Sequence, residues 1–321
     1  MKEPTYRQTL SHAWDVVWHN KALWILGLFS VLLGQFGFSD IFGKIWAMLE
    51  TTLAGQTNFF LPVINLNWSG DVRSTLGIVW LAGIVLSIVI FLIFLAVTSQ
   101  GALIFYASEW LQTKKHPKLS KPWGRSLKNF WSILLVNVLR QAFLLLLLAL
   151  FWLVFKNFIY SPNFIWSLGL AVALTVVLLV SLFVSVIFIF TLCALVIDNK
   201  GFKAAIAKAY NIFSQHLLVS LEVGVLLMLL NFLLLIAAIV AAFFAFLPAV
   251  LIWLLAGLTN LVVLAAVGFA VGVFLWVVLI VLIAGFFNAY TTSAWVFLFV
   301  KMHKEGINSR VIHFFKHMLG K

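Results

Sequence analysis

The stretch that decides the fold is FIWSLGLAVALTVVLLVSLFVSVIFIFTLCALVI, residues Phe164–Ile197, which holds no charged residue. A helix needs about 20 apolar residues to cross the hydrocarbon core of a bilayer, and this stretch exceeds that length. Four other stretches also reach it: Leu76–Thr98, Ile133–Phe155, Leu217–Leu247 and Ala249–Val300. They lack the strict alternation of apolar and polar residues that a transmembrane β-barrel requires, so membrane-spanning helices are expected.

The composition points the same way. Of the 321 residues, 64% are hydrophobic and 9% are charged, against roughly a quarter charged in an ordinary soluble domain. A soluble protein of this length would lack the polar groups to cover its surface. We therefore expect an all-α, polytopic transmembrane helical bundle that forms a single integral membrane domain over residues 1–321.

The placement of lysine and arginine predicts the orientation. With six spans and a cytoplasmic N-terminus, 17 of the 21 lysines and arginines fall on the cytoplasmic side. Lys44, Arg73 and Lys156 fall outside, and Arg140 lies within a span. Because cytoplasmic loops carry an excess of these residues, both termini are expected in the cytoplasm of a multi-pass cell-membrane protein. The same placement explains the net charge of +12 without a nucleic-acid partner.

The region after Pro248 is too long for one crossing, yet two crossings would put the basic C-terminus outside. Proline removes a hydrogen-bond donor and clashes with the preceding turn, so span five is expected to end near it. Residues 249–258 would re-enter the membrane, lie at its interface or protrude. A turn is expected at Thr259-Asn260, with span six running from about Val262 or Gly268 to Val300.

Three cytoplasmic segments share a pattern: Tyr6–Trp14, Trp123–Trp131 and Phe202–Tyr210. Each begins with an aromatic residue, followed by a small residue at +3, an aliphatic at +4, Ala or Phe at +7 and an aromatic at +8. These offsets form one face of a helix, typical of an amphipathic helix at the lipid headgroups. The pattern predicts three units of interfacial helix plus helical hairpin, at about 5–112, 122–199 and 201–303, and a basic amphipathic tail at 304–321.

The stretch from Ala194 to Tyr210, ALVIDNKGFKAAIAKAY, ends a span in an acidic residue and continues into a short amphipathic helix. This arrangement resembles a loose group of uncharacterised prokaryotic six-helix membrane proteins, which includes the membrane domain beside some glycerophosphodiester phosphodiesterases. The chain has neither room for their soluble catalytic barrel nor a cluster of Glu, His and Asp to replace it. The resemblance therefore implies a membrane module of a bacterial or archaeal cytoplasmic membrane, without that activity.

Two charged residues, Arg140 and Glu222, lie inside predicted spans three and five. A charge in hydrocarbon costs about 2.5–3.5 kcal/mol, so each is expected to find water or a partner, and we predict that they form an ion pair. The pair could serve a proton- or ion-coupled site or a lipid headgroup site. A packing pair, or an Arg140 side chain that extends to the interface, is the preferred interpretation. Further polar positions in the predicted bundle are Asn137, Gln141, Asn231 and Asn288.

Motifs for catalysis are missing from the sequence. It has no His-Glu-x-x-His, no phosphate-binding glycine loop and no closely spaced pair of carboxylates. Cys193 is the single cysteine. His313 and His317 have the spacing of metal ligands, but a basic interfacial helix explains them better. We therefore expect no enzyme, no cofactor and no metal.

Two functions stay open. The leading hypothesis is a non-enzymatic module that binds membrane lipids or organises membrane-protein partners, including a homo-oligomer. The alternative is a transporter or channel for an ion or small molecule, with a path between the repeats near Arg140 and Glu222. A water-filled cavity reaching mid-membrane would favour transport, whereas aliphatic packing with grooves that face lipid would favour the module.

Overall fold

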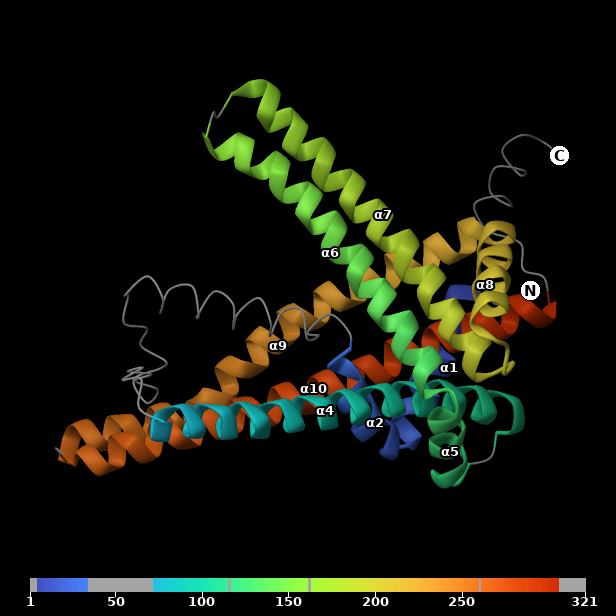
Figure 1. The fold of residues 1–321 in the computed structure, drawn as a ribbon. Coiled ribbons are helices and arrows are strands. Elements are labelled where there is room, and N and C mark those ends of the chain that lie inside the picture. Colours follow the sequence, from blue (N-terminus) through green and yellow to red (C-terminus); the bar gives the residue numbers. More distant parts are fainter. Residues whose placement is uncertain (1–4, 34–71, 115–116, 161–162, 260, 306–321) are drawn as a thin grey trace.

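The computed structural model describes residues 5–33, 72–114, 117–160, 163–259 and 261–305 (Figure 1). Across these residues the chain is helical and has no strand, which confirms the all-α prediction. The helices, in chain order, are α1 (Thr5–His19), α2 (Ala22–Val31), α4 (Val72–Thr113), α5 (Ser120–Lys128), α6 (Phe130–Tyr160), α7 (Phe164–Val196), α8 (Phe202–Gln215), α9 (Leu217–Thr259) and α10 (Val262–Glu305).

Five helices of the described chain, α4, α6, α7, α9 and α10, are long and apolar enough to cross a membrane. They indicate a membrane-embedded protein. The remaining expected span, the first along the chain, would begin with α2, which is apolar but covers only Ala22–Val31 in the described chain. Residues 34–71, which follow α2, and residues 306–321 of the basic tail lie outside the described residues.

The prediction that a helix ends near Pro248 is wrong. Helix α9 continues through Pro248 to Thr259, and α10 begins at Val262, close to the expected turn. Packing explains the continuity, because Ala249 is buried against α10, where a Cβ added to Gly272 would lie 2.9 Å from the Cβ of Ala249. Contacts with a neighbouring helix can hold a proline-containing membrane helix together.

Helices α9 and α10 are unusually long. They contain 43 and 44 residues, which at 1.5 Å per residue corresponds to about 65 Å each. The hydrocarbon core of a bilayer is about 30 Å thick. The two helices form an apolar hairpin that far exceeds the length of a single crossing.

Buried residues concentrate at one end of the molecule, which we call the hub. It comprises Ala96–Ala107 of α4, Val186–Val196 of α7 and Ala289–Met302 of α10, together with α1, α5 and α8. Figure 1 shows the α6–α7 and α9–α10 hairpins extending from the hub in different directions. Away from the hub, large apolar side chains are exposed, with Phe164 and Phe243 each 81% exposed. Surrounding lipid would cover these hairpins without a hydrophobic penalty.

The short helices pack in a regular way. Helix α5 packs on α4, α8 packs on α7, and α1 packs on α10. Helices α4, α7 and α10 also contact one another and form the centre of the hub. The three amphipathic segments therefore lie around one helical core.

Candidate functional site

The centre of the hub holds a group of buried polar side chains, none more than 7% exposed. The group consists of Thr98, Ser99 and Gln100 on α4, Thr191 on α7, and Thr292 and Ser293 on α10. The threonine hydroxyls of Thr98 and Thr191 donate back to the carbonyls of Phe94 at 2.5 Å and Ile187 at 2.8 Å. Such bonds satisfy a hydroxyl within its own helix, so these two threonines serve helix packing.

Asn137 of α6 connects this group to the α6–α7 hairpin. Its Nδ2 donates to Gln100 Oε1 at 2.7 Å and to the Ile133 carbonyl at 2.9 Å. The Oδ1 atom of Asn137 is buried and has no hydrogen-bond partner within the described chain. The predicted polar position at Asn137 is therefore an interhelical contact with one unused acceptor.

Arg140 follows Asn137 by one helical turn, so the two side chains share a face of α6. One guanidinium nitrogen of Arg140 donates to the carbonyl of Leu33, just beyond the end of α2. Its Nε atom is buried and lacks a hydrogen-bond partner within the described residues. Gln141, the next residue, is partly exposed. Sequence reasoning missed the Leu33 partner, since a backbone carbonyl leaves no sequence signal.

Glu222 lies near the start of α9 and is partly exposed. Helix α9 packs on α10, α7 and α8, while α6, which carries Arg140, packs on α7 and α4. The contact that the structure gives to Arg140 is the Leu33 carbonyl. The Arg140–Glu222 ion pair stays a prediction.

Asn288 of α10 holds α2 in place. Its Nδ2 donates to the Gly27 carbonyl at 2.9 Å and to the hydroxyl of Ser30. The helices approach so closely that a Cβ added to Gly27 would lie 2.1 Å from the Gly285 carbonyl oxygen. Glycine at both positions allows the polar contact to form. Asn288, predicted as a polar bundle position, is thus an anchor for α2.

Asn231 lies in a different environment, at an open groove of about 1560 Å³ between α9 and α10. Among the described residues that line the groove, it is the only polar one. The others are aliphatic or aromatic: Val225, Met228, Leu229, Phe232, Leu234, Ala238, Ile239, Ala242, Phe243, Phe246, Leu247, Val250, Trp276, Ile280, Ile283, Ala284 and Phe287. Such a lining suits a hydrocarbon chain and is unsuited to a hydrated ion.

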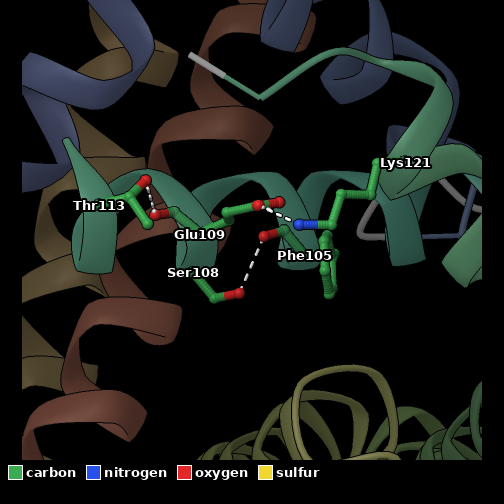
Figure 2. Close-up of polar contacts among 5 residues, drawn as sticks. All are labelled: Phe105, Ser108, Glu109, Thr113 and Lys121. Atoms are coloured by element: carbon green, nitrogen blue, oxygen red, sulfur yellow. Dashed lines mark hydrogen bonds and ion pairs between the residues drawn. The ribbon is translucent and has the colours of Figure 1, made fainter. Parts of the chain in front are cut away.

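Within the hub, polar contacts attach the short helices to the long ones. Figure 2 shows Lys121 of α5 donating to Glu109 Oε1 of α4. Lys208 of α8 likewise donates to Asp198 Oδ2 at 2.5 Å, just after α7. Lys301 of α10 donates to the side chain of Gln8 on α1. The two acidic residues at the ends of α4 and α7 are therefore engaged with lysines of the following helices.

The described residues contain no group of three or more His, Cys, Asp or Glu side chains that could hold a metal ion. Cys193 is fully buried in the hub. His313 and His317 lie outside the described residues. Within the described chain, the polar side chains thus fall into three settings: contacts between helices, the surroundings of Arg140, and the groove at Asn231.

No protein-family model, curated protein or solved structure matches this chain. The resemblance to prokaryotic six-helix membrane proteins stays a prediction, and any function must be argued from the residues and their geometry.

Proposed function

We propose that this chain is a six-span, non-enzymatic module of the cytoplasmic membrane, built from three repeats, that binds lipid in the groove of its α9–α10 hairpin. The order of elements supports the repeats. Each of the amphipathic helices α1, α5 and α8 precedes an apolar helix, and α4, α7 and α10 close the three units. Each amphipathic helix packs on the last helix of the preceding unit, and α1 on α10 closes the cycle.

The sequence motif supports the same repeats at the level of single residues. The small residue at +3 of each motif is Thr9, Ser126 or Ala205, and each of these is fully buried. On α4, Gly101 lies under Ser126, where a Cβ on the glycine would come within 2.3 Å of the Ser126 hydroxyl. A small residue at this position lets an amphipathic helix approach the core closely. This module fits the resemblance to prokaryotic six-helix proteins.

The observation that carries the proposed lipid binding is the groove between α9 and α10. Its volume of about 1560 Å³ and its apolar lining fit acyl chains. The helices around it expose apolar side chains, such as Phe243 at 81%, which would be surrounded by lipid. The acyl chains of this lipid would fill the groove. Basic residues of α8, such as the exposed Lys203, would face anionic headgroups at the cytoplasmic surface. The same surface is where membrane-protein partners or a second copy would bind.

Filling the groove is expected to displace the lipid. Ala242→Trp should weaken the affinity for co-purified phospholipid about tenfold, equivalent to about 1.4 kcal/mol, because the indole takes the space of an acyl chain. Native mass spectrometry of the full chain in mild detergent measures the retained lipid.

Ala237→Trp is the matched control, since Ala237 lies on the same helix, is exposed and does not line the groove. It should retain the lipid of the unmodified chain. Equal lipid occupancy in both variants and the unmodified chain would contradict lipid binding in the groove.

The proposed orientation gives a second expected result. In a Cys193→Ala background, a cysteine at Lys128 on α5 should react with a membrane-impermeant maleimide only after the cells are permeabilised. A cysteine at Thr259, between α9 and α10, should react in intact cells. Labelling of Lys128→Cys in intact cells would overturn the cytoplasmic placement of α5 while leaving the membrane embedding intact.

A transporter or channel near Arg140 and Glu222 is the second candidate. The observation in its favour is a charged guanidinium among apolar helices, which in a membrane protein marks a candidate functional site. The groove argues for the first candidate, because an apolar lining offers no replacement for the hydration shell of an ion.

A further inference from the structure

We infer that Arg140 binds the anionic oxygen group of a membrane amphiphile, a carboxylate or a phosphate, at the junction of α2, α4 and α6. This inference rests on the proposed lipid binding and adds a charged site, separate from the α9–α10 groove. Arg140 lies about 15 Å along α6 from its first residue, counted at 1.5 Å per residue. Arginine keeps its charge in proteins, so a group at this position requires a counter-charge or water.

The protein groups around Arg140 supply only part of what it needs. The Leu33 carbonyl accepts one hydrogen bond and lies at the negative end of the α2 dipole. A neutral carbonyl compensates a full positive charge incompletely. The buried Nε of Arg140 has no partner within the described residues. The ion pairs that the structure gives, Glu109 with Lys121 and Asp198 with Lys208, engage other cations.

The geometry of a guanidinium selects the ligand. Its N–H donors form a planar fork that matches the two oxygens of a carboxylate or phosphate. One terminal nitrogen donates to the Leu33 carbonyl, which leaves Nε as a donor without an acceptor among the residues that the structure describes. An anionic oxygen group would satisfy this nitrogen and neutralise the charge in one contact.

The surface of α6 lets such a ligand enter from the bilayer. Val138 and Leu139, next to Arg140, are 54% and 41% exposed. Phe143 and Leu150, three and ten residues after Arg140, share its face of α6 and are also exposed. An acyl chain can therefore lie along this row with its charged end at Arg140. The ligand class is an anionic amphiphile.

The unmodified full chain in detergent provides the first test. Oleate should bind at least about tenfold more tightly than oleyl alcohol, which has the same chain and no charge. Phosphatidylglycerol and inorganic phosphate are compared in parallel. Tight binding of oleate alone would identify the ligand as a free carboxylate, and tight binding of phosphatidylglycerol would identify it as a lipid phosphate. Tight binding of inorganic phosphate would indicate a ligand without an acyl chain and would overturn the proposal of an amphiphile. The proposal would also be overturned if neither oleate nor phosphatidylglycerol bound more tightly than oleyl alcohol.

Variants then place the site. Arg140→Gln should remove the preference for the charged ligand, Arg140→Lys should retain part of it, and Lys128→Gln on the exposed surface of α5 should leave it unchanged. If Lys128→Gln loses the preference and Arg140→Gln keeps it, the headgroup binds at the interface and the proposal fails. Ala242→Trp separates the two sites, because it should lower lipid retention in the groove without changing the preference of Arg140 for oleate.

Discussion

Replacing Phe190 with alanine is expected to destabilise the protein by about 2–3 kcal/mol. Phe190 is fully buried in the hub, with its ring centroid 6.0 Å from that of Trp295 and 5.9 Å from that of Phe299. Removal of a buried phenyl ring in a soluble protein costs about 3–5 kcal/mol. In a membrane, unfolded helices stay in hydrocarbon, so the contribution from transferring the ring to water is absent. The contribution from lost packing contacts remains, and the expected cost is therefore smaller. Thermal or SDS unfolding of the full chain in detergent measures the change.

Phe164→Ala is the matched control on the same helix, because Phe164 is 81% exposed. It should leave the unfolding free energy within about 0.5 kcal/mol of the unmodified chain. The contrast tests the division of the molecule into a packed hub and lipid-covered hairpins. Equal destabilisation by both variants would show that the hairpins are packed against something other than lipid.

Replacing Gly27 with leucine is expected to separate α2 from α10, at a cost of about 3 kcal/mol. Even a Cβ at Gly27 would lie 2.1 Å from the carbonyl oxygen of Gly285, and backbone on both sides leaves no flexible side chain to move away. Overpacking of this kind commonly costs about 1–3 kcal/mol, and a leucine is larger than a methyl group. Separation would also break the contacts of Asn288 with Gly27 and Ser30.

Gly83→Leu provides the comparison, since a Cβ at Gly83 on α4 would meet no atom of the described residues within 4 Å, apart from the adjoining turns of its own helix. It should be neutral or slightly stabilising, because leucine favours a helix more than glycine does. Limited proteolysis of the N-terminal region in detergent should accelerate in Gly27→Leu alone. Unchanged stability and proteolysis in Gly27→Leu would contradict the close approach of α2 and α10.

Apolar length located the long helices well from the sequence. The stretch Phe164–Ile197 corresponds to α7, Phe164–Val196, within one residue. The error at Pro248 has a physical source. A local rule for proline competes with tertiary packing against Gly268 and Gly272 of α10, and the local sequence holds no information about that packing.

The sequence predicts which polar residues belong to the candidate site, but not their hydrogen-bond partners. Asn137 and Asn288 were recognised as polar positions, and both form interhelical hydrogen bonds. Their partners lie on helices distant in sequence. Gly27 and Gly285 went unnoticed because glycine is common in membrane helices and carries no mark of a close approach. The groove at Asn231 depends on the angle between α9 and α10, which a hydropathy pattern does not encode.

The length of the α9–α10 hairpin also determines how it must sit in a bilayer. A hairpin of about 65 Å in a hydrocarbon layer about 30 Å thick keeps all its apolar surface in hydrocarbon only when it tilts roughly 60° from the membrane normal. Single helices tilt by 0–40°. The mismatch therefore strains the bilayer or the hairpin wherever the membrane is thin. Bilayer thickness would therefore affect this hairpin and the groove between its helices.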